Sequence, residues 1–400
     1  MKVLIVGGAG RMASGIIQDL LDIDSDEIAH VTLADINFPK LKERIEVFGG
    51  DKLSPVILDI SNQDALVRLI EKHDVVVNAA VGSTNLQVIN AALTAGVNFI
   101  GLVGVDLPGS AVGAPLDELG LPTQSFKEDL DSKFKEAGIT ALLGLGSMPG
   151  TSNLMGRYFG DMLDRVESME FTYVYARLGE TKAIFPFNPL GMIGQYTLQP
   201  VILNNGKLRR VPARYGREKS LFPEPIGMRE VFNILHEEPV CFAYSFRNKG
   251  LKNAGTKAGW GPDIISTLEL LDSLGLLDFE VRKVGDVSVV PARVLVSGLT
   301  SDERKQPRDY GCTRLVIRGE KAGQTVEYNA EVLSRPYKRL GGTEYRTGIP
   351  AAIGIRMLGK GQITRKGAFS VENGIDPHVY FKELSRRDLY LDYTIKHRVS

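Results

Sequence analysis

Short apolar runs alternate with amphipathic segments along the first 143 residues of the chain. Six runs rich in β-branched residues have the character of buried strands, at residues 2–6, 30–35, 55–59, 74–80, 97–103 and 139–143. Between them, apolar residues recur at helical spacing at 12–21, 41–48, 64–72, 86–95 and 125–137. This alternation predicts a parallel sheet with right-handed crossovers.

The pattern changes after residue 150. Apolar and polar residues alternate with the period of a half-exposed strand at 168–177, 287–296, 313–318 and 325–333. One helix is predicted at 264–274, and the stretch 182–239 is predicted to be rich in loops. Helical spacing returns at 349–358 and 377–387. We therefore expect a second, largely antiparallel sheet and a final segment that packs back onto the first domain.

Glycines follow the first predicted strand at once. Gly8, Gly10 and Ala13 fit the spacing G-x-G-x-x-(G/A) between a strand and an amphipathic helix. In this arrangement the first glycine makes a tight turn, the second lets the backbone approach a pyrophosphate, and the third, small residue lets helix and strand pack closely. The stretch therefore predicts a dinucleotide site at a helix N-terminus.

The second predicted strand ends in an acid, Asp35, which lies 25 residues after Gly10. A carboxylate there accepts hydrogen bonds from an adenosine ribose and repels a 2′-phosphate, so the sequence favours NAD over NADP. Ligands of parallel sheets bind at the carboxyl ends of the strands. The residues expected to line the cofactor crevice are Gly8, Ala9, Gly10, Arg11, Met12, Asp35, Asp59, Ile60, Asn78, Ala79, Ala80, Val81, Val103, Gly146 and Pro149.

These observations predict an α/β fold with three parts. Residues 1–150 are expected to form a Rossmann-type, doubly wound parallel sheet that binds the dinucleotide. Residues 151–346 are expected to form an α+β domain for substrate binding and dimerisation, with a mixed, largely antiparallel sheet. Residues 347–400 are expected to return to the Rossmann domain.

Composition narrows the class of partner. The 400 residues carry 48 Lys and Arg and 48 Asp and Glu, so no net field attracts nucleic acid or an anionic membrane. Cys241 and Cys312 have no metal-ligand or C-x-x-C spacing, and no metal site is predicted. The absence of a long apolar run or a secretory leader favours a cytoplasmic protein. Expected partners are a small-molecule substrate and a second copy of the chain, because sheet edges need cover.

Three motifs together resemble the saccharopine dehydrogenase-like oxidoreductases, a family that includes lysine 6-dehydrogenases and carboxynorspermidine dehydrogenases. The first is the glycine turn at residues 6–12, which many dehydrogenases share. The second is the junction at 144–154, with Pro149-Gly150-Thr151-Ser152-Asn153. The third is the stretch 347–352, followed by 367–369 and 376–384. The last two in this order are the more specific, and the resemblance covers nearly the whole chain.

The resemblance implies a nicotinamide-dependent enzyme that oxidises a CH–NH group, or reduces the imine, of an amino-acid-derived substrate such as lysine or saccharopine. Residues 188–191 and 205–207 are similar to lysine-pathway members, whereas 235–238 and 313–319 are closer to carboxynorspermidine members. A polyamine dehydrogenase is therefore one alternative. The other is a non-catalytic NAD-binding sensor or scaffold, because Gly261-Pro262-Asp263 lacks the histidine that lysine-pathway members carry there.

Chemistry at a nitrogen needs a group that carries protons. His236 with Glu237 is the leading candidate pair, since imidazole titrates near neutrality and an adjacent acid can hold its protonation state. The alternative interpretation of these residues is a solvated turn before Pro239. Asp106 is a weaker catalytic candidate.

A substrate carboxylate is best held by the planar fork of an arginine. Arg177 ends a predicted strand, and Arg346 precedes the predicted returning helix, so both are candidates for substrate binding. Lys182 is a weaker candidate. Solvation at the surface is the alternative for all three side chains.

Overall fold

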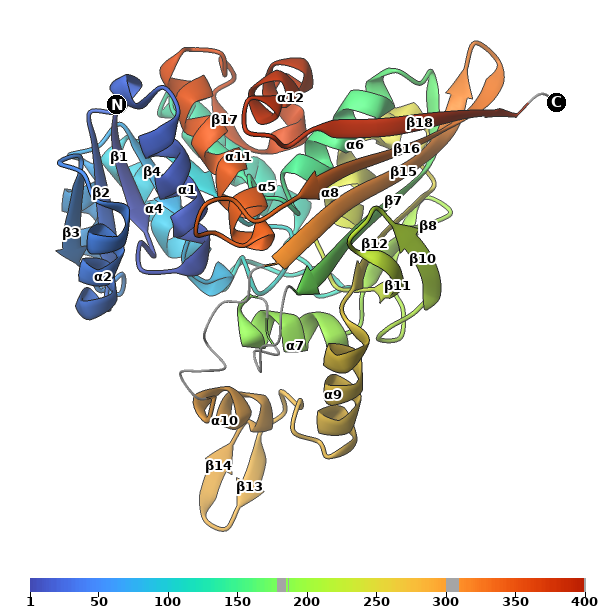
Figure 1. The fold of residues 1–400 in the computed structure, drawn as a ribbon, viewed down its shortest axis with the longest axis horizontal. Helices are drawn as coiled ribbons and strands as arrows, with labels where there is room; N and C mark the ends of the chain where they lie inside the picture. Colours follow the sequence, from blue (N-terminus) through green and yellow to red (C-terminus); the bar gives the residue numbers. More distant parts are fainter. Residues whose placement is uncertain (178–184, 186, 300–308, 399–400) are drawn as a thin grey trace. The chain divides into compact units, whose positions relative to one another are not determined.

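The computed structural model describes residues 1–177, 185, 187–299 and 309–398 (Figure 1). The chain divides into two compact units. The first comprises Met1–Met162 and Glu344–Leu391, and the second comprises Leu163–Thr343 and Asp392–Ser400. The last residues of the chain thus belong to the second unit, whereas most of the segment after residue 347 belongs to the first.

Parallel strands form the centre of the first unit. In the described chain, seven of them lie in the order β17-β6-β5-β4-β1-β2-β3. Their bounds are β1 (Lys2–Val6), β2 (His30–Asp35), β3 (Leu53–Ile57), β4 (Val75–Asn78), β5 (Asn98–Gly101), β6 (Thr140–Leu143) and β17 (Gly367–Ser370). The order of connection reverses between β1 and β4, the point at which such sheets bind nucleotides. The predicted Rossmann-type sheet is confirmed, and β17 extends it.

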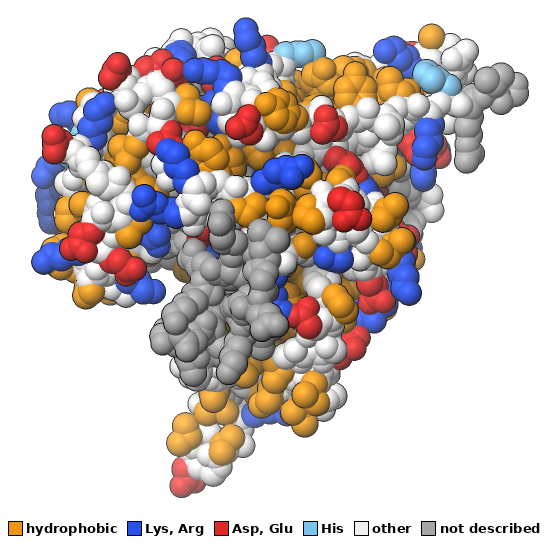
Figure 2. Space-filling view, in the orientation of Figure 1, with side chains coloured by type: hydrophobic (Ala, Val, Ile, Leu, Met, Phe, Trp, Pro, Cys, Tyr) orange, Lys and Arg blue, Asp and Glu red, His pale blue; other side chains and the backbone are white. Residues whose placement is uncertain are grey.

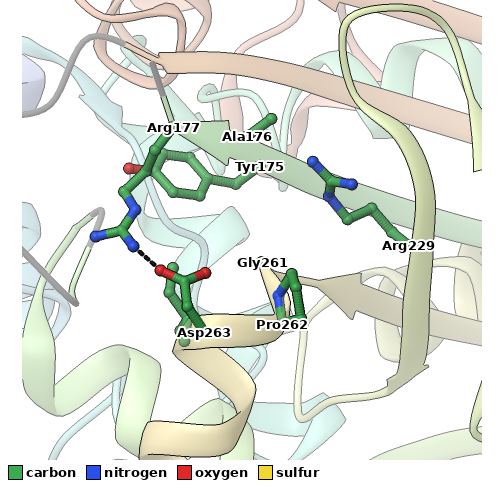
Figure 3. Close-up of a pocket in the computed structure, with 8 residues that line it drawn as sticks. Tyr175, Ala176, Arg177, Arg229, Gly261, Pro262 and Asp263 are labelled. Atoms are coloured by element: carbon green, nitrogen blue, oxygen red, sulfur yellow. Dashed lines mark ion pairs between the residues drawn. The ribbon is translucent and has the colours of Figure 1, made fainter. Parts of the chain in front are cut away.

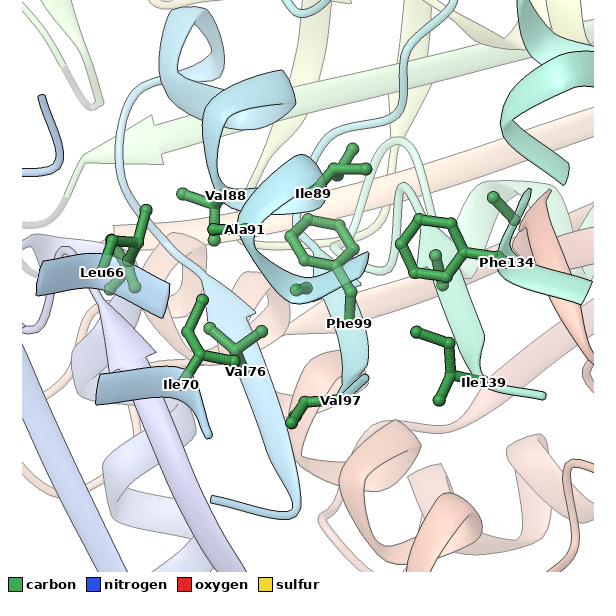
Figure 4. Packing of buried hydrophobic residues seen from close by; sticks show 14 of the residues in the cluster. Leu66, Ile70, Val76, Val88, Ile89, Ala91, Val97, Phe99, Phe134 and Ile139 are labelled. Atoms are coloured by element: carbon green, nitrogen blue, oxygen red, sulfur yellow. The ribbon is translucent and has the colours of Figure 1, made fainter. Parts of the chain in front are cut away.

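Helices follow the strands of the first unit. Their bounds are α1 (Arg11–Asp22), α2 (Phe38–Phe48), α3 (Gln63–Ile70), α4 (Asn85–Ala95), α5 (Gln124–Glu136), α6 (Thr151–Asp161), α11 (Gly342–Gly359) and α12 (Pro377–Ser385), with 3-10 turns η1 (Ser25–Glu27), η2 (Gly82–Thr84) and η4 (Val371–Asn373). Apolar side chains of α3, α4 and α5 pack against β4 and β5 (Figure 4). Each large aliphatic side chain buried there contributes about 1.5–3 kcal/mol to the folded state.

Two glycines bring the C-terminal segment onto the first helix. A Cβ atom at Gly348 of α11 would lie 2.5 Å from the backbone nitrogen of Ile16 in α1. A Cβ atom at Gly15 would lie 3.0 Å from the Cα of Gly348. The backbones of α1 and α11 therefore touch, which ties a segment from the end of the chain to the helix of the glycine turn.

A mixed sheet forms the second unit. Its described strands are β7 (Arg165–Arg177), β8 (Val201–Asn204), β9 (Lys207–Arg210), β10 (Glu218–Phe222), β11 (Gly227–Asn233), β12 (Asn253–Gly259), β15 (Asp309–Lys321), β16 (Gln324–Ser334) and β18 (Leu391–Arg398). β7 pairs with β12 in parallel and with β15 in antiparallel fashion. The prediction of a mixed, largely antiparallel sheet is confirmed.

Two local predictions in the second unit were wrong. The stretch 287–296 is a strand only in β14 (Val287–Val289), which pairs with β13 (Arg282–Val284), and α10 (Pro291–Ser297) follows. Pro291 occupies the first turn of α10, where its fixed φ suits a helix and its missing N–H costs nothing.

The described part of 182–239 contains α7 (Pro189–Thr197) and the strands β8 to β11, so it is not mainly loop. Asn205 and Gly206, with φ of 48° and 76°, form the turn that joins β8 to β9. Asn-Gly is a strong hairpin signal that the loop prediction passed over. The remaining helices of this unit are α8 (Glu238–Ser245), the 3-10 turn η3 (Arg247–Lys249) and α9 (Pro262–Ser273).

Candidate functional site

A tight turn joins β1 to α1. The N–H groups of Gly7 and Gly8 both donate to the carbonyl of Ala34, at 2.8 and 3.0 Å, and Gly10 donates to the carbonyl of Gly7 at 2.9 Å. The left-handed residue is Gly7, with φ of 80°, where the sequence pattern had assigned the turn to Gly8. A Cβ at Gly7 would lie 2.6 Å from the backbone nitrogen of Ala80. Only glycine fits this position without moving the turn.

Gly8 has a different role, which is close contact between the turn and β2. A Cβ at Gly8 would lie 2.7 Å from the Cβ of Leu33. Gly10 is the N-cap of α1, and the first turn of that helix has neither a side-chain cap nor an acidic residue. The positive end of the α1 dipole is thus not neutralised by an acid in the first turn of the helix. Ala13, the small residue of the glycine pattern, is fully buried. These residues fit the pyrophosphate of a dinucleotide.

Asp35 lies at the carboxyl end of β2, beside the turn. Its Oδ2 accepts a hydrogen bond from the N–H of Ala9 at 3.2 Å, and its Oδ1 accepts one from Asn37 at 2.9 Å. On the other side of Ala9, Arg44 of α2 donates to the Ala9 carbonyl at 3.2 Å. Burial lowers the pKa of the Arg44 guanidinium, although Glu344 and Glu43 oppose this effect. A carboxylate and a guanidinium therefore both flank the expected ribose position.

Exposed aliphatic side chains surround this point. Ile36 follows Asp35 and is 70% exposed, and Ile57, the neighbour of Asp35 in β3, is 61% exposed. Asp59 and Ile60 follow β3. Hydrogen bonds from Ser61 lower the pKa of the exposed Asp59 carboxyl. Apolar surface of this kind suits an adenine ring, which has two apolar faces.

Buried amides hold the carboxyl ends of β4 and β5. Asn78 donates to the Oδ1 of Asn85 at 3.1 Å and accepts from the N–H of Ala80 at 3.2 Å. Asn85 in turn donates to the carbonyls of Val103 and Gly104, at 3.3 and 2.8 Å. The network fixes the backbone that follows both strands. This backbone includes Ala79 and Val81, which the sequence analysis predicts to line the cofactor crevice.

The loop after β6 lies at the same edge. Leu145 donates to the carbonyl of Gly101 at 2.7 Å, and Gly146 donates to the carbonyl of Pro149 at 2.9 Å. Thr151 of α6 donates back to the carbonyl of Gly146 at 2.9 Å. The structure therefore places the expected cofactor residues along one edge of the sheet, at the carboxyl ends of β6, β5, β4, β1 and β2, with Asp59 and Ile60 at the outer strand β3.

His236 lies in the second unit, immediately before α8. Its Nδ1 is 2.5 Å from the Oε2 of Glu238, which also accepts a hydrogen bond from the Thr256 hydroxyl at 3.2 Å. The partner is thus Glu238 rather than the expected Glu237. Both acids are buried and they differ in position, because Glu238 is the first residue of α8 whereas Glu237 is its N-cap.

Protonation of His236 depends on this pair. Burial disfavours the imidazolium, but the charge and hydrogen bond of Glu238, with help from Glu237, outweigh it and raise the pKa of His236 above 6.5. A raised folded-state pKa contributes stability that is fully present below about pH 6.5, the unfolded value, and is lost as pH rises through the folded pKa.

We expect Glu238→Gln to lower the pKa of His236, because burial then acts without the charge and hydrogen bond of Glu238 and only the smaller effect of Glu237 opposes it. The measurement is an NMR titration of the five histidine rings. His73 of the first unit, whose pKa is lowered by burial, serves as the internal control and should not change. An unchanged His236 titration in the variant would show that Glu238 does not hold its proton.

Asp106 is engaged elsewhere. It is 3% exposed and forms an ion pair with Lys127 of α5, with Nζ and Oδ1 2.8 Å apart. This contact holds the chain after β5 onto α5. The ion pair therefore gives Asp106 a structural role, as an anchor of the loop. The sequence had suggested a catalytic role for this residue.

The three candidate substrate-binding residues have different environments. Arg346 lies inside α11, which begins at Gly342 rather than near residue 349, and it is 7% exposed in the first unit. Arg177 ends β7 and forms an ion pair with Asp263 of α9. Lys182 lies outside the described residues.

Arg177 lines a pocket of about 240 Å³ in the second unit (Figure 3). Its lining residues are Tyr175, Ala176, Arg177, Arg229, Gly261, Pro262, Asp263 and Ile264. Figure 3 shows the side chains of Arg177 and Arg229 on opposite sides of the pocket. Arg229 lies on β11, within the stretch predicted to be loop, so the sequence analysis missed it. The sequence signal that could have found it is the turn composition of Pro223, Pro225 and Gly227, where β10 is joined to β11.

The described ranges were examined for groups of metal-ligating side chains and for membrane-spanning helices. Among these residues there is no group of three or more His, Cys, Asp or Glu side chains placed to hold a metal ion. No helix in the same ranges has the length and apolar character needed to cross a bilayer. On the face shown in Figure 2, lysine and arginine side chains are interspersed with aspartate and glutamate.

Comparisons with known proteins cover both units. A family described as "Saccharopine dehydrogenase NADP binding domain" matches residues 3–142, and one described as "Saccharopine dehydrogenase C-terminal domain" matches residues 146–389. Carboxyaminopropylagmatine dehydrogenase of Synechocystis sp. is 24% identical over 404 residues, which cover 97% of this chain and 96% of that protein. Carboxynorspermidine synthase of Vibrio cholerae is 24% identical over 392 residues, with coverage of 93% and 92%.

One solved structure has the same fold throughout. Apo saccharopine dehydrogenase (L-Glu forming) from Saccharomyces cerevisiae superimposes with a TM-score of 0.72, at 14% sequence identity, over 99% of each chain. At this identity the likeness concerns the fold.

Proposed function

Because the chain belongs to the saccharopine dehydrogenase family of oxidoreductases, we propose that it oxidises the CH–NH group of a carboxylated polyamine, or reduces the corresponding imine. The observation that carries this choice is the full-length similarity to two proteins named for amines that bear a carboxyl group. The resemblance of residues 235–238 and 313–319 to carboxynorspermidine members supports the same choice over lysine or saccharopine.

The first unit supplies the nicotinamide cofactor site. The glycine turn, the uncapped start of α1 and the carboxyl ends of β4 and β5 fit a dinucleotide. A nicotinamide cofactor held there would supply a hydride acceptor, so that loss of hydride from the C–H carbon and of a proton from the substrate nitrogen would leave a C=N bond. His236, with its proton held by Glu238, is the residue that we assign to proton transfer on the substrate nitrogen.

NAD is the cofactor that we propose, on the basis of Asp35. A carboxylate at the end of β2 binds the ribose hydroxyls and repels a 2′-phosphate. Arg44 is the opposing feature, because its guanidinium lies on the other side of Ala9 and would attract that phosphate.

Asp35→Ser is expected to shift kcat/KM at least tenfold in favour of NADP, because the charge that repels the phosphate is removed. The measurement is steady-state kinetics with both cofactors. Asp51→Ser, which removes an exposed acid from the same unit, is the matched control and should leave the ratio unchanged. A wild-type preference for NADP that is lost in Arg44→Met would contradict the assignment of NAD.

The test of the proposed function is a substrate panel followed by the absorbance of NAD(P)H. The panel contains carboxynorspermidine, carboxyaminopropylagmatine, saccharopine and lysine, each with NAD and NADP. We expect turnover with a carboxylated polyamine. Turnover restricted to lysine or saccharopine would overturn the proposed substrate, but the protein would still be an oxidoreductase that acts on amines. Dinucleotide binding without turnover of any member would favour a non-catalytic sensor instead.

A further inference from the structure

The pocket between β7, β11 and the start of α9 has an excess of positive charge. Two guanidiniums, those of Arg177 and Arg229, face one carboxylate, that of Asp263. The ion pair between Arg177 and Asp263 balances two of these three charges. Among the lining residues one positive charge therefore remains for a ligand, which matches a single carboxylate.

Arg229 carries that remaining charge. Its Nη1 donates to the carbonyl of the adjacent Met228 at 2.8 Å, and its buried Nε has no hydrogen-bond partner. No carboxylate of the described chain lies within 4.0 Å of its nitrogens, although Glu224 acts on it from farther away. A half-buried guanidinium in this state gains strongly from an incoming carboxylate, since both its desolvation and its open donors are then compensated.

The rest of the pocket is suited to such a ligand. Arg177 neutralises Asp263, so this acid does not repel an incoming anion. Tyr175, Pro262 and Ile264 line the pocket beside the arginines. The N-terminal residues of α9 line the pocket, and the positive end of the helix dipole makes a small additional contribution to the binding of an anion.

We propose that this pocket binds the carboxylate of the substrate, with Arg229 as the group that recognises it. The assignment rests on the proposed carboxylated-amine substrate and extends it, because it names the residue that separates carboxylated amines from plain ones. Arg177 acts as a positioning residue that keeps Asp263 neutralised.

The experiment uses two ligands that differ only by the carboxyl group, L-2,4-diaminobutyrate and 1,3-diaminopropane. Binding to the full chain is measured by ligand-detected NMR, with and without NADH. The wild-type protein should bind the carboxylated ligand at least tenfold more tightly. Arg229→Met should reduce this preference to near unity by weakening only the carboxylated ligand, and Arg229→Lys should keep part of it.

Arg209→Met, which removes an exposed arginine of β9 in the same unit, is the matched control and should bind like the wild type. Thermal unfolding of each variant verifies that it is folded. Equal weakening of both ligands in Arg229→Met would indicate a structural role and overturn the proposal. A wild-type protein that does not distinguish the two ligands would overturn it as well.

These outcomes are independent of the substrate panel. If the panel shows no turnover but Arg229→Met loses only the carboxylated ligand, the pocket assignment stands and the proposed reaction fails. If a carboxylated polyamine turns over and Arg229→Met retains its KM, the reaction stands and the pocket assignment fails. With a substrate found, the variant should raise KM about 100-fold and leave kcat within a few-fold, as expected for lost binding rather than lost chemistry.

Discussion

Asp19→Asn is expected to lower the free energy of unfolding of the first unit by about 3–5 kcal/mol. Asp19 of α1 is 2% exposed, and Arg356 of α11 and Arg387 after α12 are equally buried. The Asp19 Oδ1 is 2.5 Å from Nη1 of Arg356 and 3.2 Å from Nη2 of Arg387, and its Oδ2 accepts from Nε of Arg387. An amide would leave two buried guanidiniums without their shared carboxylate.

Hydrogen exchange of the amides in α1 and α11 measures this loss directly. Trp260, the single tryptophan, lies in the second unit, so its fluorescence does not report on the first. Asp26→Asn, the same change at an exposed acid close to α1 in sequence, is the control and should alter stability by less than about 0.5 kcal/mol. A change below about 1 kcal/mol in Asp19→Asn would show that the ion network contributes little.

Gly7→Ala is expected to weaken dinucleotide binding about 100-fold. The left-handed φ of 80° costs an alanine about 1–2 kcal/mol. In addition, its Cβ would lie 2.6 Å from the backbone nitrogen of Ala80, so the turn must move away from β4. The N–H groups at the start of α1 move with the turn, and they are the groups that we assign to the pyrophosphate.

Calorimetric titration with NADH tests this expectation. Gly96→Ala is the matched control, because Gly96 is the C-cap of α4 in the left-handed region, with φ of 68°, and has no neighbouring atom within 4 Å of an added Cβ. That variant carries the same backbone cost without the overlap, so it should lose stability and keep its affinity. Equal affinity in both variants would mean that the turn at Gly7 does not hold the cofactor.

The position of the expected cofactor site could be predicted from the sequence because its parts are local. A buried strand, a glycine turn and an amphipathic helix follow one another directly at residues 2–22, and parallel strands place their carboxyl ends at one edge whatever their order. The place of Asp35 could be predicted for the same reason, as the last residue of the next strand. The turn glycine itself was misplaced by one position, since adjacent glycines have the same pattern and only the backbone distinguishes Gly7 from Gly8.

The partners of charged side chains could not be predicted in this way. His236 contacts Glu238 rather than Glu237 although both acids are buried, because the start of α8 decides which carboxylate reaches the imidazole. Asp106, suggested for catalysis, is neutralised by Lys127 from the next helix. Arg229 could be recognised as a candidate ligand-binding residue only from the structure, in which residues of β11, α9 and Arg177 line one pocket.

The sequence by itself determined the alternation of strands and helices, the two kinds of sheet and the edge where the dinucleotide is expected to bind. Periodicity encodes these features because each strand or helix must bury one face, and burial is decided within a few residues of chain. Only the tertiary structure decided which charges meet. Asp19 is 337 residues from Arg356 and 368 from Arg387. No local pattern carries information about such contacts, since they form only when distant helices pack and remove both partners from water.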